Sequence, residues 1–191
     1  MPRYINHLMA ALFFIGMTGP SLADDVTDQI DEAVKAYKKE DFNTAITALD
    51  AASTLIRQKK AESVTKLLPE PLEGWQADDA SSNVAGAGMF GGGISANRHY
   101  TSDKRDIVIS ITTDSPMLQA MSMMFSNPMF MGQDNKLVVI DGRKAIINST
   151  DNTLTAMIAN KVLVKITGSG ESSPDDLKEW FKVIDFKAIE A

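Results

Sequence analysis

The strongest constraint on this fold is a change in hydrophobic periodicity at Leu68-Pro69-Glu70-Pro71. Before these prolines, apolar residues recur every three or four positions, which is typical of amphipathic helices. After them, apolar and polar residues alternate with a period of two, which is typical of strands. Two closely spaced prolines cannot continue a helix. The sequence therefore predicts a helical hairpin over residues 24–68 and an α+β sandwich domain over residues 69–191.

The first 23 residues have the pattern of a secretory signal peptide. Arg3 precedes an apolar run over residues 8–17, and Gly19-Pro20 separates that run from small residues at positions 21 and 23. The run is shorter than the roughly 20 apolar residues of a membrane-spanning helix, and no later stretch reaches that length. We therefore expect a cleaved leader over residues 1–23, no transmembrane anchor, and a mature protein in the periplasm or, alternatively, secreted.

Residues 26–68 predict two antiparallel helices separated by a polar turn at 38–41, where Asp41 can cap the second helix. Their expected apolar faces consist of Val26, Ile30, Ala33, Val34 and Tyr37, and then of Phe42, Ala45, Ile46, Leu49, Ala52 and Ile56. Residues 33–46 resemble one tetratricopeptide-type unit, in which a Tyr closes the first helix and an aromatic, Ala and Ile open the next. Because such units stack to share a core, the resemblance implies that the hairpin packs on its own C-terminal domain or on a partner.

Three pairs of segments after the prolines predict β-hairpins, namely 94–100 with 107–113, 137–140 with 144–147, and 154–159 with 162–167. Asp141-Gly142 and Asn160 suit the positive φ of tight turns. Ser173-Pro174 begins a last helix, with a buried face formed by Leu177, Trp180, Phe181 and Ile184 and with Val183 as a further candidate. The segregated strands and helices favour an α+β fold, with an antiparallel sheet arranged as a meander and covered by helices.

The order of these elements resembles the Mog1/PsbP-like sandwich over about residues 68–188. The resemblance is carried by an early Leu68-Pro69, by Gly74-Trp75, by the antiparallel sheet and by a terminal amphipathic helix. It implies a sheet covered by helices and a binding or assembly role. It transfers no catalytic residue.

Six of the protein's 11 methionines lie in residues 116–131. A helix beginning at Pro116 would place Met117, Leu118, Ala120, Met121, Met124 and Phe125 on one core-packing face. Met123, Met129, Phe130 and Met131 remain without a core role, and we interpret them as a contact surface for a partner protein, because flexible methionines adapt to different partners. Thioethers also favour Cu(I), so a copper site is the alternative.

Other chemistry has little support in the sequence. The glycines of residues 86–91 match G-x-G-x-x-G, but no buried parallel strand precedes them, so we expect a loop rather than a phosphate-binding turn. The protein has no cysteine, and its second histidine, His99, has no orienting carboxylate beside it in the sequence. A net charge of −6 argues against nucleic-acid binding. We expect no catalytic residue, no cofactor and no resident metal.

The sequence therefore predicts an exported, non-enzymatic accessory or adaptor protein that binds another envelope or secreted protein. The hairpin, the methionine-rich segment or both would make the contact. A periplasmic protein that binds a small ligand or Cu(I) is the alternative, and a hydrolase that uses His99 is a third. The sequence does not define the oligomeric state.

Overall fold

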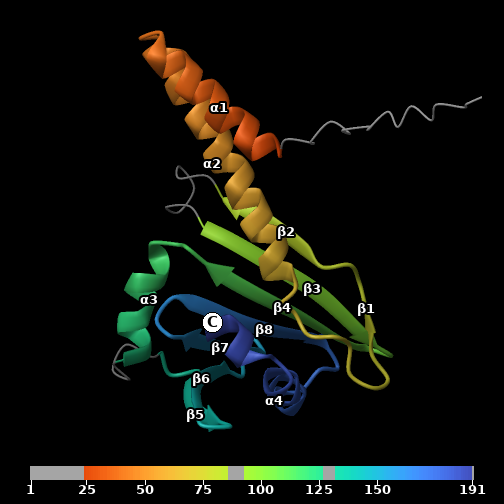
Figure 1. The fold of residues 1–191 in the computed structure, drawn as a ribbon. Helices are drawn as coiled ribbons and strands as arrows, with labels where there is room; N and C mark the ends of the chain where they lie inside the picture. Colours follow the sequence, from red (N-terminus) through yellow and green to blue (C-terminus); the bar gives the residue numbers. More distant parts are fainter. Residues whose placement is uncertain (1–23, 86–92, 127–131, 191) are drawn as a thin grey trace, which may run out of the picture.

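The computed structural model describes residues 24–85, 93–126 and 132–190 (Figure 1). The expected signal peptide, the glycine motif of residues 86–91 and the segment with Met129, Phe130 and Met131 lie outside these residues. The helices are α1 (Asp25–Lys38), α2 (Phe42–Thr65), α3 (Met117–Ser126), α4 (Pro174–Lys182) and α5 (Phe186–Glu190). The strands are β1 (Gln76–Ala77), β2 (Ser81–Ala85), β3 (Gly93–Ser102), β4 (Arg105–Thr113), β5 (Asn135–Ile140), β6 (Arg143–Asn148), β7 (Thr153–Ile158) and β8 (Val162–Gly170). The predicted α+β class, with its N-terminal helical hairpin, is confirmed.

The strands form one antiparallel sheet in the order β1-β3-β4-β8-β7-β6-β5, and β2 also pairs with β3. The expected meander is therefore wrong at one point, because β4 pairs with β8 and not with β5. Helix α3 carries the chain from the centre of the sheet to the edge strand β5 (Figure 1). Turn residues specify only the pairing of neighbours in the sequence, so this junction had no local signal.

The predicted hairpin turns are present, with one shift. Asp141 and Gly142 both have positive φ, 49° and 79°, as the Asp-Gly pair predicts. In the β7–β8 turn the positive φ values fall at Ala159 and Asn160, 47° and 56°. Strand β7 therefore ends one residue earlier than the sequence pattern predicted.

The core lies between one face of the sheet and helices α2, α4 and α5. Ile107, Ile109 and Ile111 of β4 point into it, and each is fully buried. Alternate residues such as Ser110 and Thr112 face the other side, as the two-residue period requires. Ala61, Val64 and Leu68 belong to the same core cluster, so the last part of α2 and the sheet share one core.

Tyr100 fixes the segment that follows α2 to the sheet. Its hydroxyl donates a hydrogen bond of 2.7 Å to the carbonyl of Pro69. Burial raises the pKa of Tyr100 to about 12, although nearby Arg98 acts in the opposite direction. The hydroxyl therefore stays protonated and keeps its role as donor.

Helix α4 follows the expected capping pattern. The Ser173 side chain accepts from the Asp176 backbone, and the Asp176 carboxylate accepts from the Ser173 backbone at 2.7 Å. Leu177, Trp180, Phe181 and Ile184 are buried as predicted, whereas Val183 is exposed. The short helix α5 was not predicted, and its Phe186 joins the same core.

Candidate interaction surface

Helices α1 and α2 form the predicted hairpin, and they contact each other mainly through small side chains. Asp24 and Asp41 cap the two helices. The buried alanines between the helices are Ala33, Ala36, Ala45, Ala48 and Ala52. Methyl groups allow two helix backbones to approach closely, so this contact needs no large apolar residue.

The large apolar residues of the hairpin lie elsewhere, which overturns most of the predicted buried face. Seven of them are between 40% and 66% exposed: Ile30, Val34, Tyr37, Phe42, Ile46, Leu49 and Ile56. On each helix these residues form a stripe along one side. With 100° per residue, the centre of this stripe lies about 90° around the helix axis from the centre of the alanine stripe. The sequence pattern did not separate the two stripes, because both have a helical period.

The two exposed stripes lie on one side of the hairpin. When each helix is viewed from its own N-terminus, its exposed stripe is rotated away from the alanine contact in the same direction. Because the two helices are antiparallel, this rotation places both stripes on the same side of the hairpin. The rings of Tyr37 and Phe42 meet at the turn with centroids 6.0 Å apart, which joins the stripes. We call these seven side chains the hairpin face. Figure 1 shows the hairpin projecting beyond the sheet, and none of the seven side chains belongs to the core cluster.

A groove of about 970 Å³ begins where the α2 stripe approaches the sheet. Val64 and Leu67 of α2 and Leu118 of α3 supply apolar lining, and the β7–β8 turn closes another side. At its rim Lys60 forms an ion pair of 2.6 Å with Asp114. The exposed stripe of α2 is thus continuous with a concave, partly apolar surface.

Residues 117–126 of the methionine-rich segment form helix α3, as predicted, but the expected core face is largely wrong. Leu118 is buried, whereas Met117 and Ala120 are exposed and Met121 and Phe125 are half-buried. The reason is position, because α3 lies at one end of the sheet and not over it (Figure 1). Met123 lies within α3, and the contact role of Met123, Met129, Phe130 and Met131 stays a prediction.

His99 has two carboxylate neighbours in the structure, neither of which is adjacent to it in the sequence. Its Nδ1 lies 3.0 Å from Asp78 Oδ2, and its Nε2 lies 3.1 Å from Asp106 Oδ1. Both ring nitrogens therefore lie against carboxylates of the protein itself. The arrangement ties the segment after β1 to strands β3 and β4.

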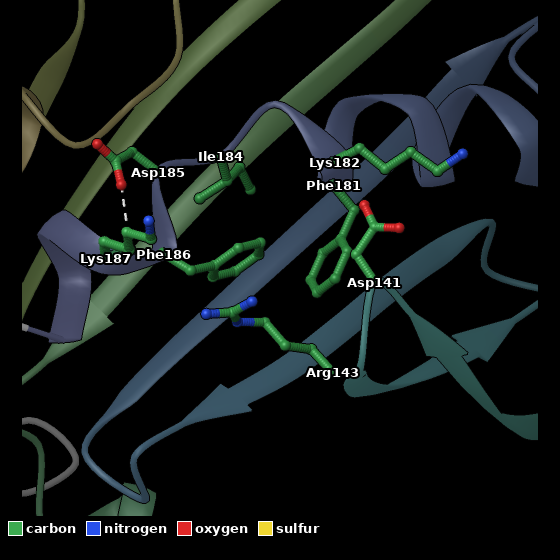
Figure 2. Close-up of a pocket in the computed structure, with 8 residues that line it drawn as sticks. All are labelled: Asp141, Arg143, Phe181, Lys182, Ile184, Asp185, Phe186 and Lys187. Carbon is green, nitrogen blue, oxygen red and sulfur yellow. Dashed lines mark hydrogen bonds between the residues drawn. The ribbon is translucent and has the colours of Figure 1, made fainter.

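A smaller pocket of about 270 Å³ lies between the β5–β6 turn and the C-terminal helices (Figure 2). Phe181, Ile184 and Phe186 supply its apolar part. Figure 2 shows Arg143 beside Phe186, and the guanidinium lies 4.5 Å from the ring centroid. The same guanidinium donates to Glu190 at 3.2 Å. Because Arg143 is already paired, it is poorly placed to bind an anionic ligand.

Within residues 24–85, 93–126 and 132–190, no group of three or more His, Asp or Glu side chains could hold a metal ion. No helix in these ranges is long and apolar enough to cross a membrane.

Comparisons with protein-family models, with curated proteins and with solved structures found no match.

Proposed function

We propose that this protein is an exported, non-enzymatic accessory protein that binds another protein chain through the hairpin face. The observation that carries the proposal is the exposure of seven large apolar side chains on one side of a projecting hairpin. If about half of each side chain is exposed, together they present roughly 600 Å² of apolar surface. That is the size of the largest apolar patch on an ordinary monomer, and such patches are often binding sites.

The internal packing of the hairpin supports this proposal. The alanine contact already holds α1 against α2, and the last part of α2 already fills the core with Ala61 and Val64. The large residues of the hairpin face therefore lie outside both the alanine contact and the core. Binding is the function that their exposure favours, because an apolar helix face gains free energy when another chain covers it.

The experiment is an affinity pulldown from cell envelopes with the full-length protein tagged at its C-terminus. The test variant is Ile46→Asp/Leu49→Asp, which places two charges on the hairpin face and leaves the core intact. The matched control is Val139→Asp, because Val139 on edge strand β5 is 66% exposed but lies outside the hairpin. Removal of the whole hairpin would be a poor test, since α2 contributes to the core.

A protein captured by the wild type and by the control, but lost from the double variant, is the expected result. Equal capture by all three forms would overturn the assignment to the hairpin face. Capture of no protein by the wild type would overturn the accessory function itself.

The groove beside α3 supports a second candidate function, the binding of a small apolar ligand. Its volume of about 970 Å³ is within the range of ligand pockets, and Val64, Leu67 and Leu118 give it apolar walls. The test is extraction of the purified protein with organic solvent and mass spectrometry of what is released. A co-purified small molecule that is lost in Leu118→Asp would favour this function.

A further inference from the structure

We propose that the partner of the hairpin face is a second copy of this protein, with helix α2 of one copy lying antiparallel to α2 of the other about a two-fold axis. The inference rests on the proposed function, because it names the occupant of the same surface. Its basis is the spacing of the exposed residues on α2, together with two charged side chains beside them.

The exposed side of α2 has the spacing of a coiled-coil seam. The positions on this side are Phe42, Ile46, Leu49, Ser53, Ile56 and Lys60, in steps of four and three. This is the alternation of a and d positions, which lets one helix pack along another. The alanine contact with α1 occupies a different side of α2, so the seam is available to a further helix.

An antiparallel pairing about a two-fold axis gives this seam a consistent register. The a positions of one helix then lie opposite the d positions of the other, so Ile46 faces Ile56 of the second copy. Leu49 faces Ser53 of the second copy, where the small side chain leaves room for leucine. The same two contacts recur on the other side of the axis, because a two-fold interface is self-complementary.

Two charges beside the seam favour this register. Asp50 follows Leu49 and Arg57 follows Ile56, two d positions of the seam, so both charges lie on the edge of α2 that faces away from α1. Within the described residues, neither side chain has an ion pair or a hydrogen bond, although both are exposed. In the proposed register, Arg57 of one copy lies on the same side of the interface as Asp50 of the other, about 7.5 Å away along the helix axis. The two side chains converge, because each leans toward the N-terminus of its own helix and the helices are antiparallel. This reciprocal complementarity points to a second copy and not to an unrelated partner.

The rest of the hairpin face is covered by the same arrangement. The ion pair of 2.9 Å between Lys59 and Asp24 sets α1 beside α2, and this brings Ile30 close to the two-fold axis. At the far end, Phe42 comes beside Lys60 of the second copy, where the groove begins. Each tip therefore reaches a concave surface on the other copy.

The area of this interface indicates how strong the dimer is. If each copy contributes roughly 600 Å² of apolar surface, the total of about 1,200 Å² is at the lower limit of specific interfaces. We therefore expect a dimer with a dissociation constant of about 1–10 µM.

The experiment is sedimentation equilibrium of the protein purified after expression of the full chain, at concentrations up to about 100 µM. We expect a monomer–dimer equilibrium in the wild type. Asp50→Arg and Arg57→Asp each replace two attractive pairs by two repulsive ones, so each raises the dissociation constant about tenfold. The double variant Asp50→Arg/Arg57→Asp restores opposite charges across the axis and restores the wild-type value.

The control is Glu32→Arg, a charge reversal of an exposed residue on α1 that lies away from the hairpin face. It leaves the dissociation constant unchanged. Circular dichroism verifies that all variants remain folded, which we expect because the substituted side chains are exposed. A wild type that stays monomeric, or a dimer that the double variant does not restore, would overturn the inference.

The outcomes separate this inference from the proposed function. A monomeric protein that still captures an envelope protein through Ile46 and Leu49 overturns the inference and leaves the accessory function standing. A dimer with the expected charge dependence, in a protein that captures nothing else, supports the inference and overturns the accessory function.

Discussion

The indole of Trp75 meets the indole of Trp180 edge to face, with ring centroids 5.4 Å apart and an angle of 86° between the planes. Trp180 also packs on Tyr100 at 4.1 Å, and the guanidinium of Arg105 lies 4.9 Å from the Trp75 ring. Residues from the segment after α2, from two strands and from α4 therefore meet in one aromatic cluster. This cluster is the point at which the N-terminal and C-terminal parts of the core are joined.

Trp180→Ala should lower the free energy of unfolding by about 3–5 kcal/mol, because it removes a fully buried indole and leaves a cavity. Trp75→Ala should cost clearly less, since Trp75 is only partly buried. Urea denaturation of both variants measures the difference. Equal losses would contradict the central position of Trp180.

Ala52→Leu should destabilise the protein by about 1–3 kcal/mol, because Ala52 is 3% exposed and a larger side chain forces α1 and α2 apart. Ile46→Ala, six residues earlier and on the exposed side of the same helix, should change stability by less than about 0.5 kcal/mol. Thermal unfolding at a protein concentration too low for association compares the two. A larger loss in Ile46→Ala would show that the hairpin face belongs to the fold.

Asp176→Asn should reduce stability at neutral pH, and the difference from wild type should disappear in acid. Partial burial acts to raise the pKa of Asp176, but hydrogen bonds from Ser173 and the nearby Arg105 outweigh it and lower the pKa. A lowered pKa in the folded state means that the carboxylate stabilises the fold above its ordinary pKa, and that this contribution is lost as the pH falls through the folded value. Urea denaturation between pH 7 and acid measures this convergence.

The control for this experiment is Asp175→Asn. Asp175 pairs only with Lys178 on the surface of the same helix, and exposed pairs contribute little. We expect this variant to follow the wild-type pH profile. If Asp176→Asn follows it too, the capping box and the Arg105 pair do not have the assigned role.

Gly170→Ala should destabilise the fold by about 3 kcal/mol or more, whereas Gly142→Ala should cost about 1–2 kcal/mol. Both glycines have positive φ, 65° and 79°, which costs any residue with a Cβ. At Gly170 the added Cβ would also overlap the carbonyl oxygen of Lys104, whereas at Gly142 it meets no atom within 4 Å. Chemical denaturation of the two variants separates steric overlap from conformational strain.

The elements that the sequence predicted correctly are those with local signals. The Asp141-Gly142 turn and the start of α4 at Ser173-Pro174 each depend on residues next to one another, and both are present. The pairing of β4 with β8 depends on strands that are far apart in the sequence, so no local pattern specified it. Strand β2 was missed because Ser81, Ser82 and Asn83 give it no alternation of apolar residues.

The candidate surface was predicted only in part, for a similar reason. The helical period located both helices of the hairpin, but it could not say whether alanines or larger residues formed the contact between them. The carboxylates beside His99 were missed because Asp78 comes 21 positions earlier in the chain, and only the fold brings it near. Hydrophobic periodicity indicates which residues of a helix or strand share a face. Which other part of the protein packs against that face depends on the fold of the whole chain.

Helix α2 belongs to two parts of the molecule at once, and this has a mechanical consequence. Its 24 residues span about 36 Å without interruption, with Phe42 at the free tip and Val64 held in the core. A helix of this kind has no hinge between its ends, so it acts as a rigid lever with its fulcrum at the sheet. A load applied at the tip is therefore transmitted to the core as torque on β2 and β3, the strands against which α2 rests.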